Sequence, residues 1–168
     1  MRAIRFFCGN IVWLGLISLL TGCATDRVAT GIVTYVNEGL LQIEELERRS
    51  LEEYAGVTGA NYKNRKEVYE TLKNKVIPIY ERFFNELRRI NPGEEEVKRV
   101  HGHYVRGAER LLNGFKMKMK GIENNDERMI LGANEMIEQG SAEIQQWRED
   151  LLSLCAEHRV APEKKKEK

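Results

Sequence analysis

The sequence ANEMIEQGSAEIQQWREDLLSLCAEH, residues 133–158, decides the fold of this chain. Mostly apolar or small residues return in it at alternating steps of four and three, and they are Ala133, Ile137, Gly140, Ile144, Trp147, Leu151, Leu154 and His158. This spacing puts them on one face of an α-helix, in the heptad pattern of helices that pack along their length. Such a helix is stable only when its apolar stripe is buried against other helices, so the stretch predicts an all-α protein.

Three upstream stretches show a similar helical periodicity, at residues 27–55, at residues 62–90 and after Asn91. Their stripes are Ile32, Val36, Gly39, Ile43, Leu46, Ser50 and Tyr54; then Tyr69, Leu72, Val76, Ile79, Phe83, Leu87 and Ile90; then Val97, His101, Tyr104, Ala108, Leu111, Phe115 and Ile122. Glycine-containing residues 56–61 and 121–125 separate these stretches, and Asn91-Pro92-Gly93-Glu94 predicts a helix that starts with Asn91 as its N-cap.

Four stretches of similar length predict an antiparallel four-helix up-down-up-down bundle over residues 27–160. Helices of about 30 residues are roughly 45 Å long, and short connections favour antiparallel neighbours. Pro78 lies in the middle of the second stretch and lacks a backbone N–H, so we expect this helix to be kinked or broken there. An even number of antiparallel helices would bring both ends of the domain to the same end of the bundle.

The first 22 residues have the composition of a secretion signal. Arg2 and Arg5 provide a positive start, and no acidic residue occurs before Asp26. The mostly apolar residues 6–20 that follow are too few for a membrane-spanning helix, which needs about 20 residues. The apolar stretch ends in Leu20-Thr21-Gly22-Cys23.

This tetrapeptide resembles the lipobox of bacterial lipoproteins. The resemblance implies cleavage between Gly22 and Cys23, acyl chains such as palmitate on Cys23, and residues 23–26 as a short tether to the bilayer. Ala24 stands where an aspartate would retain such a protein at the inner membrane, which implies the outer membrane facing the periplasm, or else the outer face of the plasma membrane. The rest of the chain resembles small helical lipoproteins of unknown function.

The charge of the chain argues against nucleic acid as a partner. Removing Arg2 and Arg5 from the 27 basic residues leaves 25 against 26 acidic residues, and phosphate binding needs a clustered basic excess. The exception is the lysine-rich tail at residues 161–168. This tail is expected either to contact anionic lipid weakly or to be a solvated terminus.

Histidines and cysteines provide few metal ligands. Cys155 lies one turn before His158, and a Cys–His pair on one helix face can hold a soft metal. Two ligands are too few, and no Cys-x-x-Cys occurs, so the sequence favours packing roles and predicts no metal site and no cofactor beyond the lipid. Cys155 is the only thiol left once Cys8 is removed and Cys23 is acylated, so no intrachain disulfide is expected.

Gly107, Gly114 and Gly121 are spaced by seven residues in the third stretch. They would allow a close approach between two helices, or leave a shallow groove for a partner; a looser bundle without use for the gap is the third alternative.

Together, these features give six candidate contacts for a ligand or partner: His101, Tyr104, Gly107, Gly114, Cys155 and His158.

No serine-hydrolase, Walker or zinc-protease motif occurs in the sequence. The sequence therefore favours a non-enzymatic envelope lipoprotein that acts as a binding, adaptor or structural module, with an envelope protein as partner. The alternative is a periplasmic carrier of a ligand or metal, with a site between helices near His101 and His158.

Overall fold

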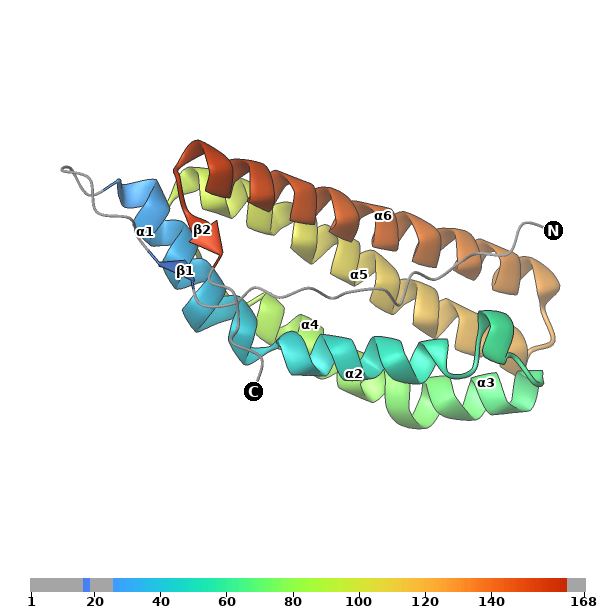
Figure 1. The fold of residues 1–168 in the computed structure, drawn as a ribbon. Helices are drawn as coiled ribbons and strands as arrows, with labels where there is room; N and C mark the ends of the chain where they lie inside the picture. The colour runs from blue at the N-terminus through green and yellow to red at the C-terminus, as the bar shows by residue number, and fades with distance from the viewer. Residues whose placement is uncertain (1–16, 19–25, 163–168) are drawn as a thin grey trace.

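The computed structural model describes residues 17–18 and 26–162, and confirms that the protein is all-α (Figure 1). Its α-helices in this part of the chain are α1 (Arg27–Thr34), α2 (Glu44–Ala55), α3 (Arg65–Thr71), α4 (Ile77–Leu87), α5 (Glu95–Glu123) and α6 (Glu127–Glu157). Two short segments, β1 (Ile17–Ser18) and β2 (Ala161–Pro162), pair antiparallel. The predicted lipidation position Cys23, the predicted cleavage position Gly22 and residues 163–168 lie outside the described residues.

The two longest helices, α5 and α6, run antiparallel side by side along most of their length (Figure 1). On the other side of the molecule α2 packs on α4, and α4 packs in turn on α5. Of the helices in the described residues, none has the combination of length and apolarity that crossing a bilayer requires.

The stripe predicted from residues 133–158 is confirmed in α6. Its members from Ala133 to Leu154 are all buried, and His158, the C-cap residue, is partly buried. Asp126 caps the start of α6 by accepting a hydrogen bond from the backbone N–H of Met129. A buried stripe of this length makes α6 one wall of the core.

The prediction of one continuous helix over residues 27–55 is wrong. After α1 the chain forms a π-helical turn, η1 (Tyr35–Gly39), and a 3₁₀ turn, η2 (Leu40–Gln42), before α2 begins. A π turn holds one residue more than an α turn and so shifts the face that is buried. Here it allows the neighbouring side chains of Tyr35 and Val36 to be buried together.

The second stretch is divided directly before Pro78. A π-helical turn, η4 (Leu72–Val76), follows α3, and α4 then starts with Pro78 in its first turn. That turn needs no backbone N–H from the proline. The side chain of Ser50 on α2 is fully buried and donates a hydrogen bond to the carbonyl of Val76 at 3.0 Å, so α2 is tied to the irregular turn.

The start of α5 differs from the prediction, since Glu94 and not Asn91 is the N-cap residue. Pro92 is buried in the connection before the helix, and Glu94 packs against Gly31 of α1. Packing of this connection on α1 accounts for the later start of the helix.

Glycines allow α5 and α6 to lie close together. A Cβ atom on Gly114 would lie 2.6 Å from Cγ1 of Ile137, and one on Gly140 would lie 2.9 Å from the carbonyl oxygen of Gly107. Gly107 and Gly121 have equally short distances to α6. Of the three alternatives left open for the heptad glycines, the structure therefore shows close helix approach.

Candidate functional site

One end of the molecule brings together the starts of α1 and α5 and the end of α6. His158 lies between carboxylates from the other two helices: its Nδ1 is 2.7 Å from Oδ2 of Asp26, and its Nε2 is 3.3 Å from Oε2 of Glu96. Asp26 is also the N-cap of α1, where Oδ1 accepts hydrogen bonds from the N–H groups of Val28 and Ala29. The side chain of His158 is only 17% exposed.

Hydrogen bonding sets the charge state of this cluster. The hydrogen bond with Asp26, and secondarily that with Glu96, raises the pKa of His158. The hydrogen bond with His158 lowers the pKa of Asp26. Asp26 is thus held ionised against the imidazole at the point where the described helical domain begins.

Glu157 completes a group of three side chains that the sequence did not bring together. One ligand atom each from Glu96, Glu157 and His158 lies within 4.8 Å of the other two. Glu96 is more than 60 residues away from His158, and nothing in its local sequence marks it. Only the antiparallel placement of α5 and α6 brings these residues together.

Cys155 is not a member of the potential metal-binding group that the described residues form. It is a free cysteine, buried in the core, and its burial raises the pKa of its thiol. Because the thiolate is the form that binds metals, this environment disfavours Cys155 as a ligand. The spacing of Cys155 and His158 in the sequence therefore does not correspond to a shared site.

His101 and Tyr104 lie in the core and not on a surface groove. Nδ1 of His101 is 3.1 Å from the hydroxyl of Tyr35. Burial lowers the pKa of His101, opposed by a hydrogen bond with the backbone of Ile90. A neutral imidazole can accept the hydrogen bond of the Tyr35 hydroxyl, so this pair links η1 to α5.

Tyr104 belongs to a second buried polar contact. Its hydroxyl donates to Oε2 of Glu47 at 2.7 Å, and its ring stacks on Trp147 with the ring centres 3.8 Å apart. Glu47 is 9% exposed, and its burial raises the pKa of the carboxyl to about 7. No sequence pattern indicated Glu47, because a glutamate on a helix is normally solvated.

Gly107 and Gly114, the other two candidate contacts, face α6. Both are buried, and a side chain at either position would collide with Ile144 or Ile137. Both glycines are therefore in contact with α6 and do not line a groove for a partner.

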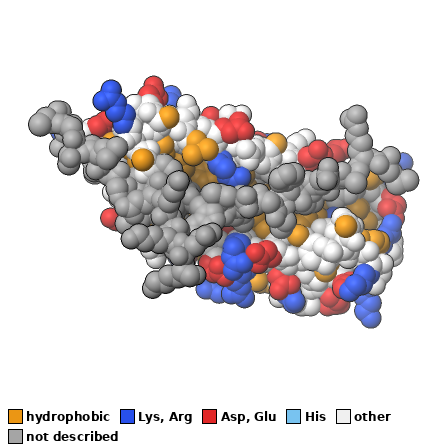
Figure 2. Space-filling view, viewed as in Figure 1, with side chains coloured by type: hydrophobic (Ala, Val, Ile, Leu, Met, Phe, Trp, Pro, Cys, Tyr) orange, Lys and Arg blue, Asp and Glu red, His pale blue; other side chains and the backbone are white. Residues whose placement is uncertain are grey.

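A cleft of about 660 Å³ opens between α1, η1 and the connection from α4 to α5. Tyr35, Ile43 and Ile90 contribute apolar surface to it, and Arg27 and Arg89 contribute charge. Tyr35 thus joins the cleft to His101 in the core. On the face shown in Figure 2, acidic and basic side chains are intermixed and do not form a patch of one sign.

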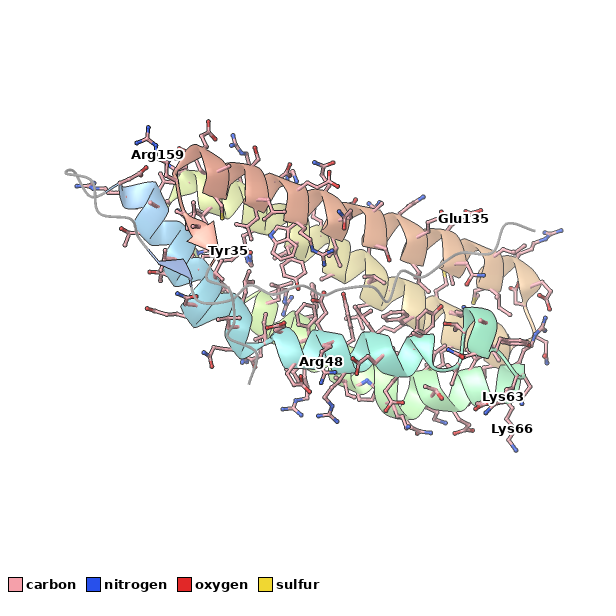
Figure 3. All side chains as sticks on the ribbon, in the orientation of Figure 1. Tyr35, Arg48, Lys63, Lys66, Glu135 and Arg159 are labelled. Carbon is pink, nitrogen blue, oxygen red and sulfur yellow. The ribbon has the colours of Figure 1, made fainter. Side chains whose placement is uncertain are left out.

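The opposite end of the molecule is formed by the turns between α2 and α3 and between α5 and α6. An ion pair between Arg65 and Glu127 joins the two turns. Figure 3 shows Lys63 and Lys66 at this end and Arg159, the neighbour of His158, at the other.

Comparisons of the chain with protein-family models, with curated proteins and with solved structures found no match.

Proposed function

We propose that this chain is a cell-envelope lipoprotein whose helical domain is a non-enzymatic binding, adaptor or structural module. Residues 1–22 are removed as a signal, and acyl chains on Cys23 hold the protein in a bilayer. The membrane is the outer membrane, with the domain facing the periplasm, or else the outer face of the plasma membrane.

One observation carries this proposal: Asp26, three residues after Cys23, is hydrogen-bonded to His158 and caps α1. The helical domain therefore begins almost directly after the lipobox-like sequence, with no room for a long linker. A domain in this position is held close to the membrane by the lipid, and multiple acyl chains make such anchoring stable.

We propose further that the helices work as an up-down-up-down bundle of four segments, with α1 and α2 as the first, α3 and α4 as the second, and α5 and α6 as the last two. The contact between Asp26 and His158 at one end supports this grouping, as does the ion pair between Arg65 and Glu127 at the other. The 31 residues of α6 span about 46 Å, so the second end projects that far from the anchored one.

The anchor is tested by replacing the cysteine in the full-length chain. The variant Cys23→Ala is expected to lose incorporation of a palmitate analogue and to leave the membrane fraction. Cys155→Ala is the matched control, because this buried thiol has no place in lipidation, and it should behave like the unmodified chain. Lipid incorporation that survives Cys23→Ala would refute the proposed anchor.

The partner is tested by site-specific photocrosslinking in intact cells. A crosslinker at Lys63 or Lys66, at the projecting end, is expected to give a discrete adduct with an envelope protein. The same group at Arg159 lies at the anchored end and should give lipid adducts or none. An adaptor that contacts its partner elsewhere would give the adduct only from other positions, for example Glu135 on α6.

A second function, carriage of a small ligand, is favoured by the 660 Å³ cleft beside Tyr35. A carrier purified from its own envelope would retain a small molecule detectable by native mass spectrometry. Ile90→Trp fills the cleft and should release that molecule, whereas Leu152→Trp on the exposed face of α6 should not. Protein without any bound molecule would leave the adaptor function as the better account.

A further inference from the structure

A cluster of acidic side chains lies around His158, at the end of the molecule beside Asp26. Asp26, Glu96 and Glu157 surround a single imidazole, that of His158. Over the described residues, the ion pairs of these three carboxylates include no lysine or arginine. Elsewhere on the surface, glutamates form ion pairs with basic side chains. One example is Glu95, which directly precedes Glu96 and pairs with Lys98. A cation bound here would reduce the repulsion between these carboxylates.

The two nitrogens of His158 have different surroundings. The distance of 2.7 Å between Nδ1 and Asp26 is that of a charge-assisted hydrogen bond. The hydrogen bond of 3.3 Å between Nε2 and Glu96 is longer and therefore weaker. With metal–ligand distances of about 2.0–2.1 Å, two ligand atoms of a tetrahedral zinc site lie about 3.3 Å apart. The separation of Nε2 and the Glu96 oxygen thus matches one edge of a zinc site.

We propose that Nε2 of His158 and the carboxylates of Glu96 and Glu157 bind one divalent transition-metal ion of the zinc class. Asp26 is the positioning residue: it accepts the Nδ1–H of His158 and orients the ring so that Nε2 faces Glu96, as carboxylates do behind metal-binding histidines. Three protein ligands leave a fourth position for water or for a group from a partner.

The imidazole selects the class of metal. Magnesium and calcium prefer six or more oxygen ligands, whereas zinc accepts a mixed nitrogen and oxygen set of four. The bound ion would join the first turn of α5 to the last residues of α6, next to the start of α1. This inference goes beyond the proposed function and does not depend on it, since all three protein ligands belong to the helices of this chain.

The test is zinc binding to the full chain purified in detergent and stripped with a chelator. Titration calorimetry should show one zinc ion per chain, and thermal unfolding should shift upward with zinc but not with magnesium. Cobalt in place of zinc should give the visible absorption of a four-coordinate site. His158→Gln and Glu157→Gln should each weaken binding at least tenfold, and Asp26→Asn should weaken it 10- to 100-fold without abolishing it.

Matched controls separate ligation from general charge effects. Glu95→Gln removes a carboxylate one residue before Glu96, and His103→Gln removes an imidazole that faces Asp150 instead. Both should bind zinc like the unmodified chain. Glu157 is exposed, so Glu157→Gln should fold normally and its effect on binding is interpretable. Absence of stoichiometric binding, or equal binding by Glu157→Gln and Glu95→Gln, would overturn the proposal.

Discussion

His158, at the end of α6, lies 2.7 Å from Asp26, the residue that caps the start of α1, across 132 positions of sequence. Asp26 is the N-cap of α1 and His158 is the C-cap of α6, so this contact joins the start of the first helix to the end of the last one. The same carboxylate also accepts hydrogen bonds from the N–H groups of Val28 and Ala29 in the first turn of α1. Replacing it therefore affects a helix start and a long-range contact together.

Substitutions at Asp26 separate these two roles. Asp26→Asn keeps an oxygen that can cap α1 but removes the charge that faces His158, and Asp26→Ala removes both. In metal-free protein we expect the midpoint of thermal unfolding to fall in the order unmodified chain, Asp26→Asn, Asp26→Ala. Equal midpoints for the alanine and asparagine variants would show that the cap contributes nothing.

Gly140→Ala tests the close approach of α5 and α6. Alanine is a better helix former than glycine by about 1 kcal/mol, so an unhindered site would be stabilised. At Gly140, however, the new Cβ would lie 2.9 Å from backbone atoms of Gly107 and Leu111, which cannot move aside as a side chain can. We expect a net loss of about 1 to 3 kcal/mol in the free energy of unfolding, measured by urea denaturation.

Gly102→Ala on α5 is the matched control for that variant. Its Cβ would meet only the guanidinium of Arg106, at 3.5 Å. This variant should be more stable than the unmodified chain by about 1 kcal/mol. If both glycine variants were stabilised, the close packing of α5 on α6 would be refuted.

The buried carboxyl of Glu47 predicts a dependence of stability on pH. Burial raises its pKa from 4.5 to about 7 in the folded protein, so the folded state binds this proton more tightly than the unfolded state. The contribution of Glu47 is therefore most favourable below pH 4.5 and is lost as the pH rises towards 7. The full loss is roughly 3 kcal/mol, from 1.36 kcal/mol for each pKa unit.

Glu47→Gln removes this titration and can still accept the hydrogen bond from Tyr104. We expect the variant to gain free energy of unfolding relative to the unmodified chain as the pH rises from 5 to 8. Urea denaturation at several pH values measures the difference. Glu53→Gln on the same helix faces Lys75 at the surface and should leave the decline with pH in place. A constant difference between Glu47→Gln and the unmodified chain would contradict the prediction.

Ser50→Ala tests the tie between α2 and η4. The Ser50 hydroxyl is the hydrogen-bond donor to the carbonyl of Val76, and removing it leaves a buried acceptor without this partner. The cost is about 1 to 3 kcal/mol of stability, which chemical denaturation would measure. Ser153→Ala, at an exposed position of α6, should change stability by less than about 0.5 kcal/mol.

The sequence by itself determined that the protein is helical and which faces of α5 and α6 are buried. The alternation of four and three in residues 133–158 corresponds to the buried face of α6, because the helical period alone sets which side chains share a face. Pro78 marked the break in the second stretch, since a missing N–H is a property of the residue. The heptad glycines indicated close packing as one alternative, and the structure selected it.

Tertiary structure decided the features that depend on contacts between distant segments. The π turn at Tyr35–Gly39 interrupts a continuous helical pattern, and its Tyr35 is buried in contact with His101 of α5. Burial of Glu47 depends on Tyr104, 57 residues away, because only packed neighbours can exclude water from a carboxyl. The surroundings of His158 also depend on tertiary structure. The sequence marked Cys23 and His158 separately, and only the folded chain placed Asp26, Glu96 and Glu157 around His158.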